Sequence, residues 1–341
     1  MQTSTKIAVA IVSVLVAGVL VLAALLIASK VKCGDASKLF SGCLAAVDSG
    51  KTGSYASQTG VRYSFPLSWS GDAYFVDLRL GANTLRCIAD TGSDALVVSG
   101  RGCQGCPRGA TFSAKQDASK PSTTIEYGSQ TAVTQQHNAR IQGIGGASSA
   151  IKVVVDVMYK VSGSSVSNVC GLGRLAGGKP GAQGAPPLLH QLVAGENLDD
   201  CVTFGLGNTN ELVLGQFTLP SNAVSLPLSA ASATMPWFTV ARSALGSACN
   251  LPASIETLIF DTGTTETLVV SSSAAAVKAL NQVTLAPGVS WPMAQYGKYV
   301  QPLQLAPGSL PAGTMLIGIN WLRQFGVVQF NSDTSKLSFA Q

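Results

Sequence analysis

The sequence has few charged residues and almost no histidine. Only 11% of its 341 residues are charged, and His137 and His190 are its only two histidines. The Lys and Arg residues form no run and are not interleaved with aromatic residues, so the net charge of +5 indicates a solvated surface rather than a nucleic-acid interface. Two isolated histidines argue against a Ser-His-Asp enzyme and against a histidine-bound zinc site. We therefore expect no nucleic-acid partner, no metal and no cofactor.

The sequence has few segments with a helical pattern. Runs of Val, Ile and Thr are interrupted by Gly, Pro, Ser and Asn about every ten residues, which is typical of strands joined by turns. Helices are expected only at residues 187–194 and 272–280. The hydrophobic content of 46% is enough to fill two β-rich cores, so the composition predicts an all-β protein.

The tripeptide Asp-Thr-Gly occurs twice, each time directly after an apolar run. The copies are Asp90-Thr91-Gly92, followed by Ser93, and Asp261-Thr262-Gly263, followed by Thr264. A buried carboxylate is costly unless it is hydrogen-bonded or has a function, and Thr, Ser and a glycine backbone supply the donors. If the two loops face each other, repulsion prevents both acids from ionising and the pair shares one proton. Such a pair activates a water molecule.

The surroundings of the two tripeptides also repeat. Apolar segments follow both copies, at Ala95–Ser99 and Thr267–Ser271. Further along the chain, two apolar residues and a glycine follow each copy, at Val169–Gly171 and Leu316–Gly318. The order of these four elements indicates an internal repeat rather than two chance turns.

With these elements in this order, residues 61–341 resemble the pepsin-like aspartic proteases. The resemblance implies an all-β, bilobal fold with one Asp-Thr-Gly loop in each lobe. It implies lobes at residues 61–220 and 221–341. The activity that it implies is that of an aspartic endopeptidase that cleaves extended peptides or proteins. Asp90 and Asp261 would be catalytic, supported by Thr91, Gly92, Ser93, Thr262, Gly263 and Thr264. Because the chain holds both loops, unlike the dimeric retropepsins, we expect a monomer.

The resemblance extends to a flap, but several residues depart from the family pattern. Thr124–Ser129, with Tyr127 beside Gly128, resembles the hairpin that folds over the cleft in this family. Val97 stands where the family commonly has a tryptophan that supports the flap tyrosine, and Ile319 stands where an Asp is frequent. Asp94 adds a third carboxylate, which raises the pKa values of the pair if it points toward them. A catalytically silent relative that acts as a binding module remains the alternative.

The eight cysteines suggest an oxidising compartment. The family often has a short disulfide loop after its first Asp-Thr-Gly strand, and Cys103 and Cys106 occupy that place, so a bridge between them is expected. Further pairs are open: Cys33 with Cys43, and Cys201 with Cys249. Cys87 and Cys170 lie in apolar strands and are expected to be buried small hydrophobes.

The N-terminus contains a long apolar segment. Ile7–Ala28 carries no charge, and about 20 apolar residues suffice to cross a bilayer as a helix. No clear cleavage site precedes Lys30, so we expect residues 1–29 to be a transmembrane signal anchor, with a cleaved signal and secretion as the alternative. Lysines on both sides leave the orientation open, and the cysteines favour a lumenal or extracellular body. Residues 30–60 then form a stalk or a short propeptide.

Overall fold

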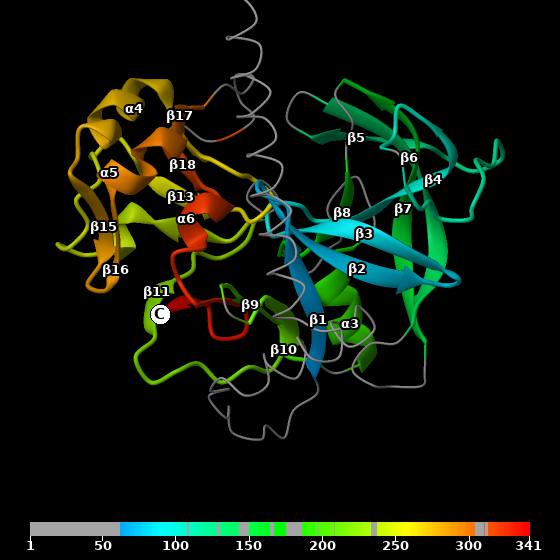
Figure 1. The fold of residues 1–341 in the computed structure, drawn as a ribbon, viewed down its shortest axis with the longest axis horizontal. Coiled ribbons are helices and arrows are strands. Elements are labelled where there is room, and N and C mark those ends of the chain that lie inside the picture. The colour runs from blue at the N-terminus through cyan, green and yellow to red at the C-terminus, as the bar shows by residue number, and fades with distance from the viewer. Residues whose placement is uncertain are drawn as a thin grey trace, which may run out of the picture. The chain divides into compact units, whose positions relative to one another are not determined.

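The computed structural model describes residues 62–107, 109–127, 130–142, 150–163, 167–174, 186–196, 198–207, 209–232, 237–303, 310 and 313–341. The predicted anchor and stalk, residues 1–60, lie outside this part of the chain. Within the described ranges, no helix is long and apolar enough to span a membrane. The described chain is mostly β-structure, in agreement with the sequence prediction (Figure 1).

The two helices expected from the sequence are present. They are α3 (Leu188–Glu196) and α4 (Ser271–Lys278). The other described helices are single turns: η2 (Arg242–Ala244), α5 (Met293–Tyr296), η3 (Gly297–Tyr299) and α6 (Ile319–Leu322). Turns this short carry no periodic pattern that the sequence could reveal.

The first Asp-Thr-Gly loop emerges from a five-strand arrangement with the order β2-β3-β8-β4-β7. Strands β3 and β8 run parallel, β4 is antiparallel to β8, and β4 is parallel to β7. The register places Asp90, the last residue of β3, opposite Gly171. The bounds are β2 (Tyr74–Leu80), β3 (Asn83–Asp90), β4 (Leu96–Gln104), β7 (Ile151–Ser162) and β8 (Asn168–Gly171).

The second loop emerges from the same arrangement, with the order β12-β13-β18-β14-β17. Again the strand before the aspartate, β13, is parallel to β18; β14 is antiparallel to β18 and parallel to β17. The bounds are β12 (Thr239–Ala241), β13 (Thr257–Phe260), β14 (Thr267–Val269), β17 (Val300–Pro302) and β18 (Thr314–Ile317). The sequence repeat thus corresponds to a repeat of strand order and direction.

Two glycines let the chain cross beneath the loops. A Cβ on Gly171 would overlap the backbone of Ala95, and one on Gly318 would overlap the backbone of Glu266. Only a residue without a side chain allows β8 and β18 to pass this close to the segment that follows each aspartate. This packing requirement explains the glycine that ends each apolar-apolar-Gly triplet.

Six antiparallel strands connect the two arrangements, in the order β11-β20-β19-β9-β10-β1. Strand β19 from the C-terminus pairs with β9 from mid-chain, and β1 pairs with both β10 and β2 (Figure 1). The bounds are β1 (Arg62–Trp69), β9 (Cys201–Gly205), β10 (Glu211–Gly215), β11 (Val224–Pro227), β19 (Val327–Asn331) and β20 (Lys336–Ala340). The remaining strands form two hairpins, β5 (Thr123–Tyr127) with β6 (Gln130–Ile141), and β15 (Gln282–Ala286) with β16 (Val289–Pro292).

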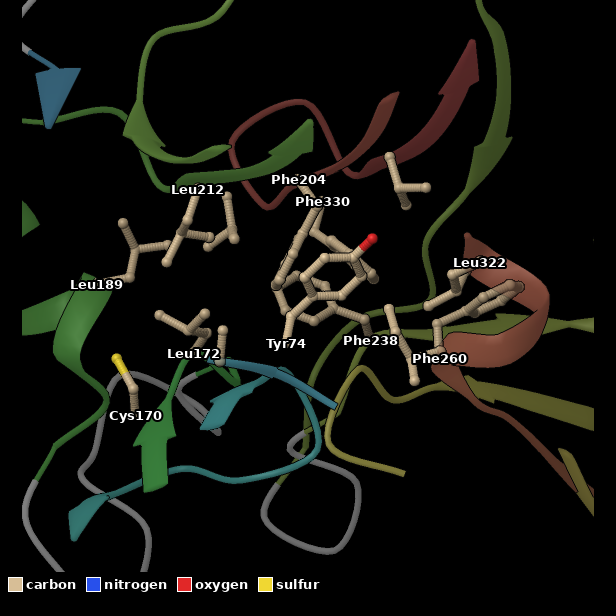
Figure 2. Close-up of a cluster of buried hydrophobic side chains, with 14 of the residues drawn as sticks. Tyr74, Cys170, Leu172, Leu189, Phe204, Leu212, Phe238, Phe260, Leu322 and Phe330 are labelled. Atoms are coloured by element: carbon tan, nitrogen blue, oxygen red, sulfur yellow. The ribbon is translucent and has the colours of Figure 1, made fainter. Parts of the chain in front are cut away.

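Aromatic side chains fill the centre of the hydrophobic core (Figure 2). The ring of Phe330 from β19 packs against Phe204 from β9 at 6.0 Å and against Phe238 at 4.8 Å between centroids. Phe260, the residue directly before Asp261, packs against Trp321 of α6 at 6.1 Å between centroids. Burial of each such ring contributes about 1.5–3 kcal/mol to the free energy of unfolding, so the strands around the loops are well packed.

The cysteines follow the sequence expectations in part. Cys103 and Cys106 form a disulfide, and Cys87 and Cys170 are buried and free. The suggested Cys201–Cys249 pair is wrong, because both residues are free cysteines. Cys201 begins the buried strand β9, whereas Cys249 lies in the turn that follows η2. Cys33 and Cys43 lie outside the described residues.

Candidate active site

The two aspartates lie at the ends of equivalent strands and are almost completely buried. Asp90 ends β3 and Asp261 directly follows β13; their exposed fractions are 9% and 8%. The backbone holds each loop to the glycine-bearing strand beneath it, because the Leu172 N–H donates to the Asp90 carbonyl at 2.8 Å and the Asp261 N–H donates to the Ile317 carbonyl at 3.0 Å. Burial of both carboxyls therefore needs specific hydrogen-bond partners.

Each carboxyl receives the same two hydrogen bonds from its own loop. The N–H of Gly92 donates to Asp90 Oδ1 at 2.7 Å, and the Ser93 hydroxyl donates to Oδ2 at 2.5 Å. At Asp261 the corresponding donors are the Gly263 N–H at 2.8 Å and the Thr264 hydroxyl at 2.6 Å. These bonds fix the orientation of both carboxyls and favour their charged forms.

Each loop glycine lies against the carboxyl of the opposite loop. A methyl group on Gly92 would overlap the Asp261 carboxyl, and one on Gly263 would overlap the Asp90 carboxyl. The two carboxyls therefore face each other across a gap that glycine alone leaves open. The sequence analysis assigned these glycines a role as backbone hydrogen-bond donors, and the structure shows that their close approach to the partner acid also requires glycine.

The two threonines link the loops to each other. The Thr91 hydroxyl accepts from the Thr262 N–H, and the Thr262 hydroxyl accepts from the Thr91 N–H, both at 3.0 Å. Each hydroxyl also donates to a strand of the opposite arrangement, Thr91 to the Phe260 carbonyl at 3.0 Å and Thr262 to the Ala89 carbonyl at 2.7 Å. Every group in this buried set has a partner, as buried polar networks require.

The electrostatics favour one shared proton. Burial holds the pKa of Asp90 well above its ordinary value, and the charge of Asp261 and a hydrogen bond with it raise this pKa further. The Ser93 hydroxyl and the Gly92 N–H lower the pKa of Asp90 and offset only part of this rise. Two facing carboxyls, one of which resists ionisation, can act as an acid and a base at the same time.

Comparison with known proteins identifies the fold. No protein-family model matches the chain, and no curated protein sequence matches it. Among solved structures, the chain is similar to the crystal structure of an aspartic proteinase from Irpex lacteus, with a TM-score of 0.58 and 17% sequence identity. The match covers 82% of this chain and 97% of that chain. The chain has a pepsin-like fold.

Two contacts in this pepsin-like fold had no signal in the sequence. The indole Nε1 of Trp237 donates to the Gly92 carbonyl at 2.7 Å, and the Thr265 hydroxyl donates to the Asp72 carbonyl at 2.9 Å. Each contact joins one loop to the segment that precedes the first strand of the other arrangement. Pairing between residues so distant in sequence becomes visible only once the strands are assembled.

The predicted flap is only partly described. Strands β5 and β6 pair as an antiparallel hairpin, as expected, and β5 is an edge strand. Tyr127 ends β5. Gly128 and the side chain of Tyr127 lie outside the described part, so the role assigned to Tyr127 stays a prediction.

The residues that depart from the family pattern occupy definite places. Val97 is fully buried in a small cluster with Ala132, Met158 and Val169, and Ile319 is buried at the start of α6. The effect of Asp94 on the aspartate pair stays a prediction. Burial raises the pKa of Asp94 itself, which lies half-buried beyond Ser93.

The described residues contain no cluster of three or more His, Cys, Asp or Glu side chains that could hold a metal ion. One pocket of about 600 Å³ lies away from the aspartates, between the β6–β7 ladder and α3, with Arg140 and Lys152 in its lining. Its described lining holds no Asp, Glu, His or Cys side chain. The candidate active site of this pepsin-like fold is the aspartate pair.

Proposed function

We propose that this chain is an aspartic endopeptidase that hydrolyses peptide bonds in extended peptides or proteins. The observation that carries the proposal is the aspartate pair itself: two buried carboxyls, each oriented by its own loop, each against the glycine of the other loop. The similarity to a solved aspartic proteinase supports the proposal at the level of the fold.

The geometry suggests how the two carboxyls act together in the reaction. Burial and the charge of the partner raise the pKa of Asp90, so the pair holds one proton, with one carboxyl protonated and the other ionised. The ionised carboxylate takes a proton from a water molecule as the water oxygen attacks the scissile carbonyl carbon, while the protonated carboxyl donates a hydrogen bond to the carbonyl oxygen. When the C–N bond breaks, the departing nitrogen takes the proton that the carboxylate received from the water. The water oxygen stays on the new carboxyl group.

The reaction requires one carboxyl protonated and one ionised, which sets the pH of action. Below the first apparent pKa of the pair the base is lost, and above the second the acid is lost. We expect a bell-shaped profile centred roughly between pH 4 and 6. A monotonic rise to pH 8 would contradict a shared proton.

The test is proteolysis of a denatured protein by the wild type and by Asp90→Asn and Asp261→Asn. Asparagine keeps the shape of the side chain but can neither share the proton nor act as a base, so each variant should lose about 10²–10⁴-fold in kcat. The matched control is Asp77→Asn, which changes an exposed carboxylate on β2 and should keep full activity. A folded but inactive wild type would instead support the catalytically silent binding module.

We also propose, from the sequence, that the chain acts as a membrane-anchored monomer with its catalytic part on the lumenal or extracellular side. The apolar segment Ile7–Ala28 and the disulfide between Cys103 and Cys106 support this proposal.

A further inference from the structure

Trp237 reaches from one half of the fold to the catalytic loop of the other. Its indole Nε1 donates a 2.7 Å hydrogen bond to the carbonyl of Gly92, 145 residues away in sequence. The side chain is half-buried and stands two residues before β12. A hydrogen bond of this length from a rigid aromatic ring fixes the carbonyl that accepts it.

The segment that carries the ring is hydrogen-bonded to β13, the strand that leads to Asp261. The next residue, Phe238, is buried against Phe330, and its carbonyl accepts a 3.0 Å hydrogen bond from the N–H of Phe260. Strand β12 then pairs with β13, with Thr239 opposite Ile259. Because Phe260 directly precedes Asp261, Trp237 links the Gly92 carbonyl to the residue at which the opposite loop begins.

The Gly92 carbonyl belongs to the same planar peptide unit as the N–H of Ser93. The orientation of this unit therefore helps to set where the Ser93 hydroxyl points, and that hydroxyl donates to Asp90 Oδ2 at 2.5 Å. On the other side of Ser93, its carbonyl accepts from the Gly173 N–H at 2.9 Å. Trp237 and Gly173 thus hold the backbone on both sides of the hydroxyl that orients Asp90.

In the part of the chain that the structure describes, the second loop has no equivalent support: no hydrogen bond to the carbonyl of Gly263 is found there, although Gly263 is the counterpart of Gly92. The corresponding contact of the second loop runs from the Thr265 hydroxyl to the backbone of Asp72, one residue further on. The indole bond therefore breaks the symmetry of two otherwise equivalent loops.

We propose that Trp237 is a positioning residue that holds the Gly92–Ser93 peptide so that the Ser93 hydroxyl stays on Asp90, and that it thereby makes the two aspartates inequivalent. This inference rests on the proposed endopeptidase function. Trp237 acts through Ser93 and does not itself exchange a proton.

The effect on pH dependence has a definite sign. The Ser93 hydrogen bond lowers the pKa of Asp90, so weakening it raises that pKa. The other titratable groups that face Asp90 are the Asp261 carboxyl and the Cys170 thiol, and burial holds the pKa of Cys170 well above its ordinary value. Neither group changes when the indole N–H is removed, so the upper limb of the pH profile should move to higher pH.

The test variant is Trp237→Phe, which keeps a six-membered aromatic ring and removes the pyrrole ring that carries the N–H donor. We expect kcat to fall about 3- to 10-fold with KM within about two-fold, because the lost bond orients a group rather than binds substrate. The upper limb should rise by about half a pH unit. Ser93→Ala should move the limb in the same direction, and the double variant should move it little further, because both changes act on one hydrogen bond.

The control is Trp69→Phe, a half-buried tryptophan whose ring packs on Tyr74 and Arg323 and which should leave the profile unchanged. An unchanged upper limb in folded Trp237→Phe, or additive shifts with Ser93→Ala, would overturn the inference. Thermal unfolding of each variant separates loss of fold from loss of positioning.

A second measurement needs no catalysis. In protein labelled with ¹³C at the Asp carboxyls, the Asp90 signal, assigned through Asp90→Asn, should titrate at higher pH in Trp237→Phe than in wild type. If wild type proves inactive but this shift is seen, the proposed function fails and the positioning role stands. If wild type is active and the Asp90 signal titrates identically in both proteins, the inference on Trp237 is wrong.

Discussion

Thr91 and Thr262 exchange hydrogen bonds across the two halves of the repeat. Each hydroxyl accepts from the backbone N–H of the other residue at 3.0 Å, and each donates to the strand that leads into the opposite loop. The four bonds are buried, and they fix the two aspartate loops relative to each other more directly than any contact of the carboxyls themselves.

We expect Thr91→Val and Thr262→Val each to lower the free energy of unfolding by about 2–4 kcal/mol, because each leaves a buried N–H and a buried carbonyl without a partner. The double variant should cost less than the sum of the two, with a coupling of about 0.5 kcal/mol or more, since both act on one network. Urea unfolding measures this. Thr84→Val, at an exposed site on β3, is the control and should stay within about 0.5 kcal/mol of wild type. If the losses of unfolding free energy in the two single variants added up fully in the double variant, the hydrogen bonds of the two threonines would be independent.

The internal repeat was predictable because each of its parts requires particular residue types at neighbouring positions in the sequence. The sequence pattern shows an apolar strand before Asp90, an apolar segment after it and a later apolar-apolar-Gly triplet. The glycine of this triplet, Gly171, is required by its contact with Ala95. The apolar spacing also predicted a helix at residues 187–194, which is found as α3 (Leu188–Glu196). The order and direction of the strands were not among the expectations.

Other features depend on tertiary contacts that no local pattern encodes. Trp237 reads as an ordinary aromatic residue before a strand, and its bond to Gly92 exists only because β12 lies beside β13. The pairing of Cys201 with Cys249 was suggested by sequence order alone, whereas burial in β9 leaves Cys201 a free thiol. The direction of the Asp94 side chain likewise depends on the packing of the assembled loop.

The loop glycines should be intolerant of any side chain. Gly92→Ala places a methyl group on the Asp261 carboxyl, and Gly263→Ala places one on the Asp90 carboxyl. Relief of this overlap requires the acids to move apart, so we expect a loss of about 100-fold or more in kcat and about 1–3 kcal/mol of stability. Kinetics at the optimum pH and thermal unfolding measure the two effects.

Gly195→Ala is the matched control for the glycine variants. Gly195 lies in α3, and a Cβ there meets no atom within 4 Å. Alanine restricts the unfolded chain and suits a helix, so this variant should be neutral or more stable by about 0.4–1 kcal/mol. Wild-type activity in Gly92→Ala would show that the carboxyls do not face each other as closely as described.

The N-terminal segment should anchor the protein in a membrane. Ile7–Ala28 buries enough apolar side chain to hold the chain in a bilayer, so full-length protein should remain in the membrane fraction after carbonate washing. Deletion of residues 1–29 should release it. Recovery of a soluble species that begins near Ser29, from cells that make the full-length chain, would instead establish cleavage and secretion.

The aspartate pair should also change how stability depends on pH. The pKa of Asp90 is higher in the folded protein than its ordinary value of 3.8, so the folded state binds a proton that the unfolded state has released. The stability that this proton contributes is fully present below the unfolded pKa and is lost as the pH rises through the folded pKa. Wild type should therefore lose stability relative to Asp90→Asn as the pH rises from the ordinary pKa of Asp90 through its raised pKa in the folded protein, because the variant has no carboxyl to ionise at this position.

Free energies of unfolding at several pH values, measured for both proteins under one buffer series, give the difference directly. Asp77→Asn serves as the control, since its carboxylate is exposed on β2 and its stability curve should run parallel to that of wild type. The difference between Asp90→Asn and wild type should increase with pH in favour of the variant. A difference that shrinks as the pH rises would mean that the fold stabilises ionised Asp90, and the proton shared by the pair would then have to be abandoned.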